Sequence, residues 1–314
     1  MKSAAAQTCL HRLTARPLSG LPLFVLALLL FSGWLTGCVS LGGGPSPEFT
    51  EVLLQGEGDP KILLIDINGP IANQPILVPN LGILPGMTAR IRQELEIAFN
   101  DPDVRGLLLR INSPGGTLTD SDIIYHSLME FKKSKQVKIL AAMGDIAASG
   151  AVYIAMAADE VFAHPTTITG SIGVVMPHLN YSGLMKKLGV ESDPVVSGPY
   201  KDLDSPMKPR NPEERALLQN LIDQQYEKFV DVVKAGRPKM TTSQIREMAD
   251  GRIFSAQEAK KRGLIDEVGY LDDAYKRIGE MAGFPVNRLV RYANAWRTGN
   301  NIYSNAFPVE LIEN

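Results

Sequence analysis

Runs of apolar residues alternate with amphipathic segments through the middle of the chain. The apolar runs are continuous, a pattern typical of strands that are buried on both faces of a sheet. The intervening segments place apolar residues at the helical period of 3.6. Strands are expected at residues 61–67, 104–111, 137–143 and 161–163, and helices at 87–100, 120–133 and 149–159. This alternation predicts an α/β fold with mainly parallel strand pairing.

The second half of the chain has a different sequence pattern. Pro194 to Pro209 is polar and rich in proline, which predicts a loop. A long helix is expected from Asn211 to Gly236, with Asn211 as its cap and Pro212 at its first position. Residues 242–282 indicate short helices around a strand near Leu264, and the tail from residue 284 onward shows no clear period.

The N-terminus has the pattern of a targeting segment. Lys2, Arg12 and Arg16 are followed by an apolar run from Leu21 to Phe31 and by Leu-Thr-Gly-Cys ending at Cys38. This order resembles a bacterial lipobox, in which the cysteine receives a lipid. An uncleaved signal anchor is the alternative, although eleven apolar residues are fewer than the roughly 20 that span a bilayer. We therefore expect a lipoprotein signal peptide at 1–37, a tether at 38–58, a catalytic domain at 59–283 and a tail at 284–314.

Charge and cysteine content narrow the function classes. The formal net charge is −2, so no basic signature of nucleic-acid binding is present. The chain has two cysteines, Cys9 in the targeting segment and Cys38 in the lipobox, so neither a disulfide nor a cysteine metal site is expected in the mature protein. Lipid on Cys38 would place the protein at the cell envelope, as a membrane-anchored lipoprotein that faces the periplasm or the cell exterior.

Ser149 is a candidate nucleophile. It follows a strand and a turn of small residues and stands where a helix begins, which leaves the Gly150 N–H without a partner in the helix. Such N–H groups favour a developing oxyanion. Gly116, after another strand, could supply a second backbone donor. The alternatives are a plain helix cap for Ser149 and an ordinary turn at Gly116.

The base for such a serine is less evident. His11 lies in the targeting segment, His126 falls inside a helix, and His164 and His178 neighbour prolines, so a Ser-His-Asp triad has little support. A lysine can act as a base where burial disfavours the ammonium form. Taken alone, Lys201 has the setting of a solvated loop lysine.

Four motifs in order change this picture. Asn112-Ser113-Pro114-Gly115-Gly116, Ala147-Ala148-Ser149-Gly150, Thr169-Gly170-Ser171-Ile172-Gly173 and Ser197-Gly198-Pro199-Tyr200-Lys201-Asp202 together resemble the signal peptide peptidase A family of serine proteases. The resemblance extends over residues 61–279. It implies a Clp-protease-like, crotonase-like fold of repeated β-β-α units in a single catalytic domain.

The resemblance also implies roles for individual residues. Ser149 would be the nucleophile, Lys201 the general base, and Ser171 the serine that hydrogen-bonds the lysine. The backbone of Gly116 and Gly150 would hold the oxyanion. The family forms homo-oligomeric rings in which serine and lysine can come from neighbouring subunits, and it needs no metal or cofactor.

The expected function is therefore a serine endopeptidase that hydrolyses hydrophobic or extended peptides, such as cleaved signal peptides, at the cell envelope. Two alternatives remain open at this point. One is a catalytically silent envelope lipoprotein that acts as a scaffold. The other is an acyl-CoA hydratase or isomerase on the same general fold, which would have little use for a serine–lysine pair.

Overall fold

The computed structural model describes residues 49–78, 82–293 and 301–303 of the 314. The described residues all belong to one compact unit. Cys38 and the expected signal peptide lie outside the described residues. The strands are β1 (Thr50–Gly56), β2 (Lys61–Asn68), β3 (Ile76–Val78), β4 (Gly82–Leu84), β5 (Val104–Ser113), β6 (Lys138–Ala148), β7 (Glu160–Ala163), β8 (Ile168–Gly170), β9 (Ile253–Ser255), β10 (Glu267–Val268) and β11 (Arg288–Ala293). The helices are α2 (Met87–Asn100), α3 (Leu118–Lys135), α4 (Gly150–Ala155), α5 (Ser182–Leu188), α6 (Pro212–Gly236), α7 (Thr242–Met248), α8 (Ala256–Arg262) and α9 (Leu271–Met281).

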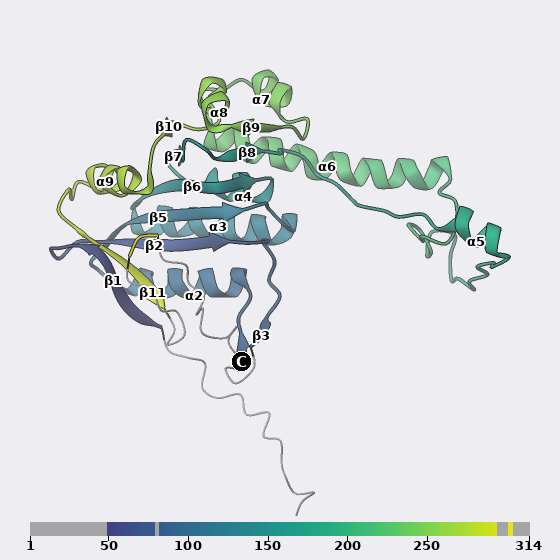
Figure 1. Cartoon of the computed structure of the whole chain (residues 1–314), viewed down its shortest axis with the longest axis horizontal. Coiled ribbons are helices and arrows are strands. Elements are labelled where there is room, and N and C mark those ends of the chain that lie inside the picture. Colours follow the sequence, from purple (N-terminus) through teal and green to yellow (C-terminus); the bar gives the residue numbers. More distant parts are fainter. Residues whose placement is uncertain (1–48, 79–81, 294–300, 304–314) are drawn as a thin grey trace, which may run out of the picture. The chain divides into compact units, whose positions relative to one another are not determined.

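One mixed sheet organises the described residues. Its strand order is β1-β11-β2-β5-β6-β7-β10, and β8 and β9 extend it from the second half of β6 (Figure 1). The pairs β2–β5, β5–β6 and β6–β7 are parallel, as the sequence predicts, and β1–β11 and β8–β9 are antiparallel. The expectation of a single α/β domain is confirmed.

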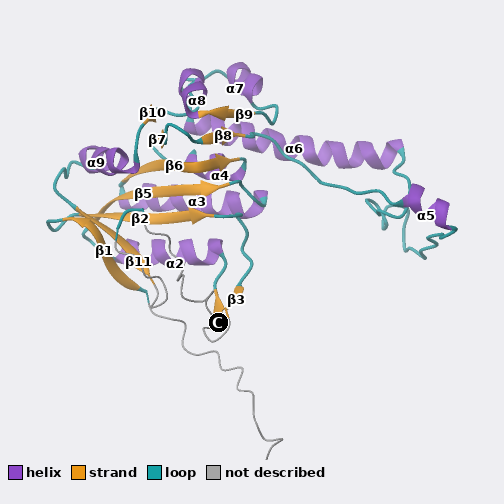
Figure 2. Ribbon diagram, viewed as in Figure 1, coloured by secondary structure: helices purple, strands orange, loops and turns teal. Residues whose placement is uncertain are grey.

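Both faces of the sheet are buried, which explains why its strands are continuously apolar. Along β2, Leu63 and Ile65 face a core that includes Ile91 of α2 and Leu128 of α3. Leu64 faces a second core that includes residues of α9. Figure 2 shows α2 and α3 running alongside the central strands. No helix in the described part of the chain has the length and apolar character needed to cross a membrane.

Several elements differ from the sequence expectations. β6 continues to Ala148, through the small residues expected to form a turn, and α4 ends at Ala155, four residues before the expected end. Helix α5 was not expected. The strand expected near Leu264 is β10, a few residues later, and Leu264 itself is buried in the loop before it. Helix α6 begins at Pro212 with the Asn211 side chain accepting from the Glu214 N–H, as expected.

The two ends of the domain also need correction. The expected tether includes β1, and the expected tail includes β11, which pairs antiparallel with β1 and parallel with β2. Neither strand was predicted, because neither forms a continuous apolar run. β1 is a largely exposed edge strand, and β11 carries Arg288 and Arg291. Arg291 is only 1% exposed and lies near the buried Asp66. The folded region therefore extends beyond residues 59–283 on both sides.

Residues 174–211, which we call the arm, include α5 and lead to the start of α6. Figure 1 shows α5 beside the end of α6 that is farthest from the sheet. No residue from 173 to 213 is buried, although the structure describes all of them. The arm has no hydrophobic core of its own.

Candidate active site

Strand β6 carries Ser149 to its position by changing partners. Its first half pairs with β7 through Leu140 to Met143, and its last residues, Ile146 to Ala148, pair with β8. At the end of this second ladder, the Ser149 N–H donates to the Gly170 carbonyl at 2.9 Å. The serine is therefore held by the sheet on one side and begins helix α4 on the other.

Ser149 has a strained backbone. Its φ is 55° and its ψ is −121°, and it is one of four non-glycine residues with positive φ in the described chain. Such a conformation costs on the order of 1–3 kcal/mol and persists only where the surroundings impose it. Its side chain makes no capping hydrogen bond to α4, so the interpretation as a plain helix cap does not describe this serine. The half-buried hydroxyl is left available for other contacts.

The backbone of Gly116 runs next to this serine. Ile71 forms a parallel bridge to it, in which the Ile71 N–H donates to the Gly115 carbonyl and the Thr117 N–H donates to the Ile71 carbonyl. In a parallel bridge of this kind, the middle residue turns its own N–H away from the partner strand. Within the described chain, the Gly116 N–H has no acceptor.

The same N–H lies beside the start of α4. A Cβ built on Gly150 would be 3.4 Å from the Gly116 nitrogen, and one built on Gly115 would be 2.8 Å from both the Gly150 nitrogen and the Ser149 Cβ. As the first residue of α4, Gly150 has an N–H without an acceptor in the helix. The backbone nitrogens of Gly116 and Gly150 thus lie close together beside Ser149, where two N–H groups could stabilise an oxyanion.

Ser171 is also brought to this place. It directly follows Gly170, whose carbonyl accepts from Ser149, and its own N–H donates to the Arg252 carbonyl at 2.7 Å. Its φ is 52°, so both serines of the site have left-handed backbones. The structure therefore groups Ser149, Ser171 and the N–H groups of Gly116 and Gly150.

Lys201 does not join them within this chain. It is exposed in a turn, and the neighbouring Tyr200 hydroxyl donates to Glu213 at the start of α6. The other end of α6 packs near the serine, because the Phe229 ring lies 5.1 Å from that of Tyr153, in the helix that Ser149 begins. Sixteen residues separate Glu213 from Phe229, or about 24 Å along the helix axis.

One residue of this site was not expected from the sequence. Gly115 has a φ of 99° and touches Ser149, so a side chain there would collide with the nucleophile. The available signal was the Gly-Gly pair, of which only Gly116 was singled out. No group of three or more His, Cys, Asp or Glu residues in the described part of the chain is arranged to hold a metal ion.

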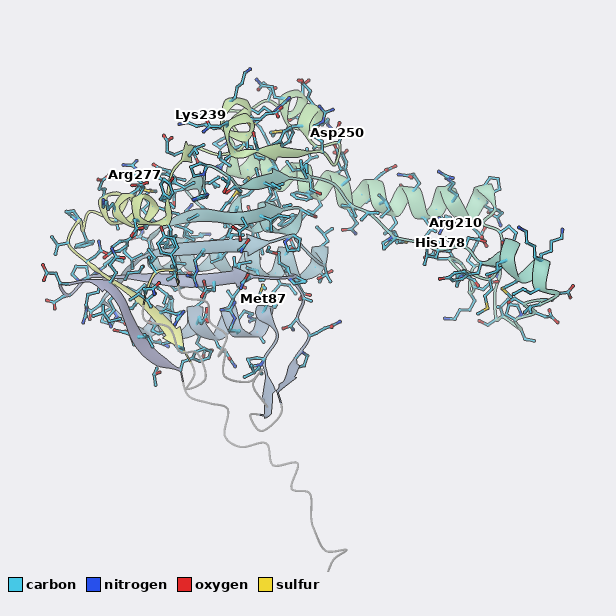
Figure 3. All side chains as sticks on the ribbon, viewed as in Figure 1. Met87, His178, Arg210, Lys239, Asp250 and Arg277 are labelled. Carbon is cyan, nitrogen blue, oxygen red and sulfur yellow. The ribbon has the colours of Figure 1, made fainter. Side chains whose placement is uncertain are left out.

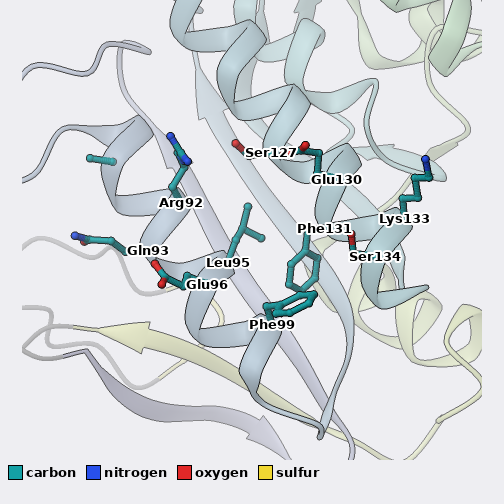
Figure 4. Close-up of a pocket in the computed structure, with 11 residues that line it drawn as sticks. Arg92, Gln93, Leu95, Glu96, Phe99, Ser127, Glu130, Phe131, Lys133 and Ser134 are labelled. Atoms are coloured by element: carbon teal, nitrogen blue, oxygen red, sulfur yellow. The ribbon is translucent and has the colours of Figure 1, made fainter.

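Ser149 does not line either of two prominent cavities in the described chain. One is a groove of about 1050 Å³ between α2 and α3, where Phe99 and Phe131 lie among charged and polar residues (Figure 4). The other, of about 390 Å³, lies at the carboxyl ends of β2 and β5 beside the middle of β6, and it includes Asp66 and His164. Neither includes the residues that converge on Ser149.

Two family models match parts of the chain. Residues 131–284 match the model of peptidase family S49, and residues 65–170 match that of Clp protease. The chain is 35% identical to the Enterococcus faecium protein named "Putative signal peptide peptidase SppA", over 83% of this chain and 75% of that protein.

The alignments with two further relatives cover smaller shares of those proteins. The Synechocystis protein named "Putative protease slr0021" is 44% identical over 58% of this chain and 65% of its own length. "Serine protease SPPA, chloroplastic" from Arabidopsis thaliana is 30% identical over 78% of this chain and 36% of its own length. From the match to the family model and the extended similarity to the Enterococcus protein, the chain belongs to peptidase family S49, a family of SppA-like serine proteases, and has the mixed α/β fold of Clp proteases.

Proposed function

We propose that this protein is a serine endopeptidase in which Ser149 is the nucleophile and Lys201 the general base. The observation that carries the proposal is the strained, uncapped Ser149 beside the backbone nitrogens of Gly116 and Gly150. A left-handed serine at a helix start is costly to maintain and has no evident structural use here. The family membership favours peptide hydrolysis over the acyl-CoA chemistry considered above.

The chemistry proceeds in two steps. Neutral Lys201 takes the proton from the Ser149 hydroxyl as its oxygen attacks a peptide carbonyl, and the N–H groups of Gly116 and Gly150 stabilise the oxyanion. The lysine then gives the proton to the leaving amine. Water, deprotonated by the same lysine, hydrolyses the acyl-enzyme and releases Ser149. Ser171 would orient the lysine amine without adding a negative charge.

Lys201 would reach Ser149 from a neighbouring copy of the chain. The length of α6 separates the two residues within one chain, and the arm exposes large apolar side chains that a partner could cover. A homo-oligomeric ring meets both requirements, because each arm would then deliver its lysine to the next subunit. Contact with that subunit would also shield Lys201 from water, which favours the neutral amine.

The proposed substrates are hydrophobic or extended peptides, such as cleaved signal peptides. The support for this substrate class is that a relative is named as a signal peptide peptidase. Lipid on Cys38 would anchor the protein at the cell envelope, where such peptides are released. Mass spectrometry of the mature N-terminus tests the anchor, and an unmodified Cys38 within an intact leader would contradict it.

Covalent labelling tests the nucleophile. A fluorophosphonate should label the native protein at Ser149, and Ser149→Ala should lose both labelling and peptide cleavage while it keeps its fold. The matched control is Ser127→Ala, which removes an exposed serine hydroxyl that donates only within α3. Near-native cleavage by Ser149→Ala would refute the assignment, and an unlabelled, inactive native assembly would favour a silent scaffold.

A further inference from the structure

The turn that carries Lys201 is built from consecutive short-range hydrogen bonds. The N–H groups of Lys201, Leu203 and Ser205 donate to carbonyls three residues earlier, at 3.0–3.1 Å. Asp204 closes this series with a φ of 67°. Aspartate enters the left-handed region more readily than most residues, but short hydrogen bonds at a surface do not fix such a turn by themselves.

The Asp204 carboxylate connects this turn to two other segments of the arm. His178 Nδ1 lies 2.9 Å from an Asp204 carboxylate oxygen, and the Arg210 guanidinium donates to the same oxygen. His178 precedes α5, and Arg210 directly precedes the cap of α6. Figure 3 shows His178 and Arg210 close together at the end of α6 nearest α5. We call these three residues the arm clamp.

Two side chains of the arm clamp have polar atoms that are shielded from solvent. The His178 side chain is 14% exposed, and neither His178 Nε2 nor Arg210 Nε contacts solvent or a hydrogen-bond partner in the described chain. Both side chains therefore direct their polar contacts to Asp204. A second ionic contact, from Lys208 to Asp202 and Glu214, ties the same turn to α6.

We propose that Asp204 is a positioning residue for Lys201. The proposal rests on the function proposed above, in which Lys201 is the base. The arm contains no buried residue, so the clamp and the contacts of Lys208, rather than a hydrophobic core, hold the turn in one conformation. A lysine that must meet the serine of another subunit has to be presented by its own chain, and a loosely held turn would reach the reactive geometry only part of the time.

Asp204→Asn is the sharpest test, because asparagine keeps the size and the left-handed preference while it removes the charge. We expect kcat to fall roughly 10- to 100-fold, as for a misplaced catalytic group, with KM within about twofold of the native value. Hydrogen exchange should become faster in residues 198–205 and stay unchanged in the sheet. The mass of the assembly should also stay unchanged.

Two further variants separate charge geometry from general destabilisation. Arg210→Met should reproduce the effect of Asp204→Asn, whereas Arg210→Lys keeps a cation near the carboxylate and should recover most of the lost kcat. Glu227→Gln, which breaks an exposed ion pair with Arg246, should leave kcat unchanged.

The outcomes distinguish this proposal from the one on which it rests. Native kcat in Asp204→Asn, with native exchange in residues 198–205, would overturn the positioning role. Full activity in Lys201→Met would instead refute the base assignment, and with it any catalytic role for the clamp. Faster exchange accompanied by loss of kcat supports the proposal.

Discussion

The two halves of the proposed dyad lie in regions built on opposite principles. Ser149 lies between a sheet ladder and α4, a helix whose six residues are all buried. Lys201 lies in the arm, where no residue is buried and ionic contacts replace a core. The first region is complete within one chain and maintains a strained backbone. In the proposed assembly, the second region presents Lys201 to a neighbouring copy of the chain.

The arm also exposes several large apolar side chains. Leu179 and Leu188 are each 69% exposed, Leu184 is 58% exposed, and Val175 is 82% exposed. Covering a leucine side chain contributes about 1.5–3 kcal/mol. Contact with a neighbouring copy could therefore supply the stabilisation that the arm lacks internally.

The largest effect is expected when the two members of the proposed dyad are removed in separate variants of the protein. Ser149→Ala and Lys201→Met should each be inactive, because each removes one member of the dyad. When the two variants exchange subunits in equal amounts, a random ring should regain about a quarter of native activity, because one boundary in four joins an intact serine to an intact lysine. Peptide cleavage before and after exchange measures this. If the mixed rings stay inactive, the dyad forms within one chain.

The second prediction concerns the apolar surface of the arm. Leu184→Asp combined with Leu188→Asp should dissociate the assembly and abolish peptide cleavage, because the charges cannot be buried at a subunit contact. The circular dichroism spectrum should stay native, since neither leucine belongs to a core. Leu53→Asp, which alters an exposed leucine on β1, is the control and should keep its mass and activity. An active monomeric double variant would contradict the assembly model.

The third prediction concerns the backbone next to the nucleophile. Gly115→Ala places a Cβ 2.8 Å from the Ser149 Cβ and the Gly150 nitrogen, so it should displace the oxyanion donors. We expect kcat to fall about 100-fold, which is typical of a lost oxyanion contact. Gly69→Ala is the matched control, because Gly69 also has a positive φ but a Cβ there would contact nothing within 4 Å. Equal loss of kcat in both variants would assign the effect to backbone strain alone.

The sequence predicted these two regions unequally, for a physical reason. The sheet strands leave continuous apolar runs and the helix at Met87–Asn100 leaves an amphipathic period in the sequence, and the structure contains both kinds of element. Prediction of the site relied on short motifs in a fixed order along the chain, such as the small residues around Ser149. In contrast, the arm has no core and therefore no period, so α5 and the clamp residue His178 gave no signal. Strands β1 and β11 were hidden because polar and charged residues interrupt them.

The smallest expected effect concerns the ion pairs of the two regions. Their contributions to the free energy of unfolding should differ in how they depend on pH. In the sheet region, Lys61 donates to Asp101 and Glu51, each at 2.8 Å. Burial raises the pKa of Asp101, but hydrogen bonds from Lys61 and from the Asp103 N–H outweigh it and hold the pKa below its ordinary value of 3.8. A depressed pKa in the folded state stabilises the protein above the pKa of the unfolded state, and this contribution disappears as pH falls through the folded-state value.

Asp101→Asn should therefore lower the free energy of unfolding by about 1–2 kcal/mol at pH 7, as for a charge-assisted hydrogen bond that is partly buried. The difference from the native protein should shrink as pH falls below about 4, where the unfolded carboxylate becomes protonated. Urea unfolding at a series of pH values measures this. Asp202→Asn is the matched variant in the arm, where the hydrogen bond from Lys208 also lowers the pKa of the carboxylate. Because the arm shares no core with the sheet, Asp202→Asn should leave the unfolding midpoint of the sheet unchanged at every pH. A pH-dependent loss of sheet stability in Asp202→Asn would show instead that the two regions unfold as one cooperative unit.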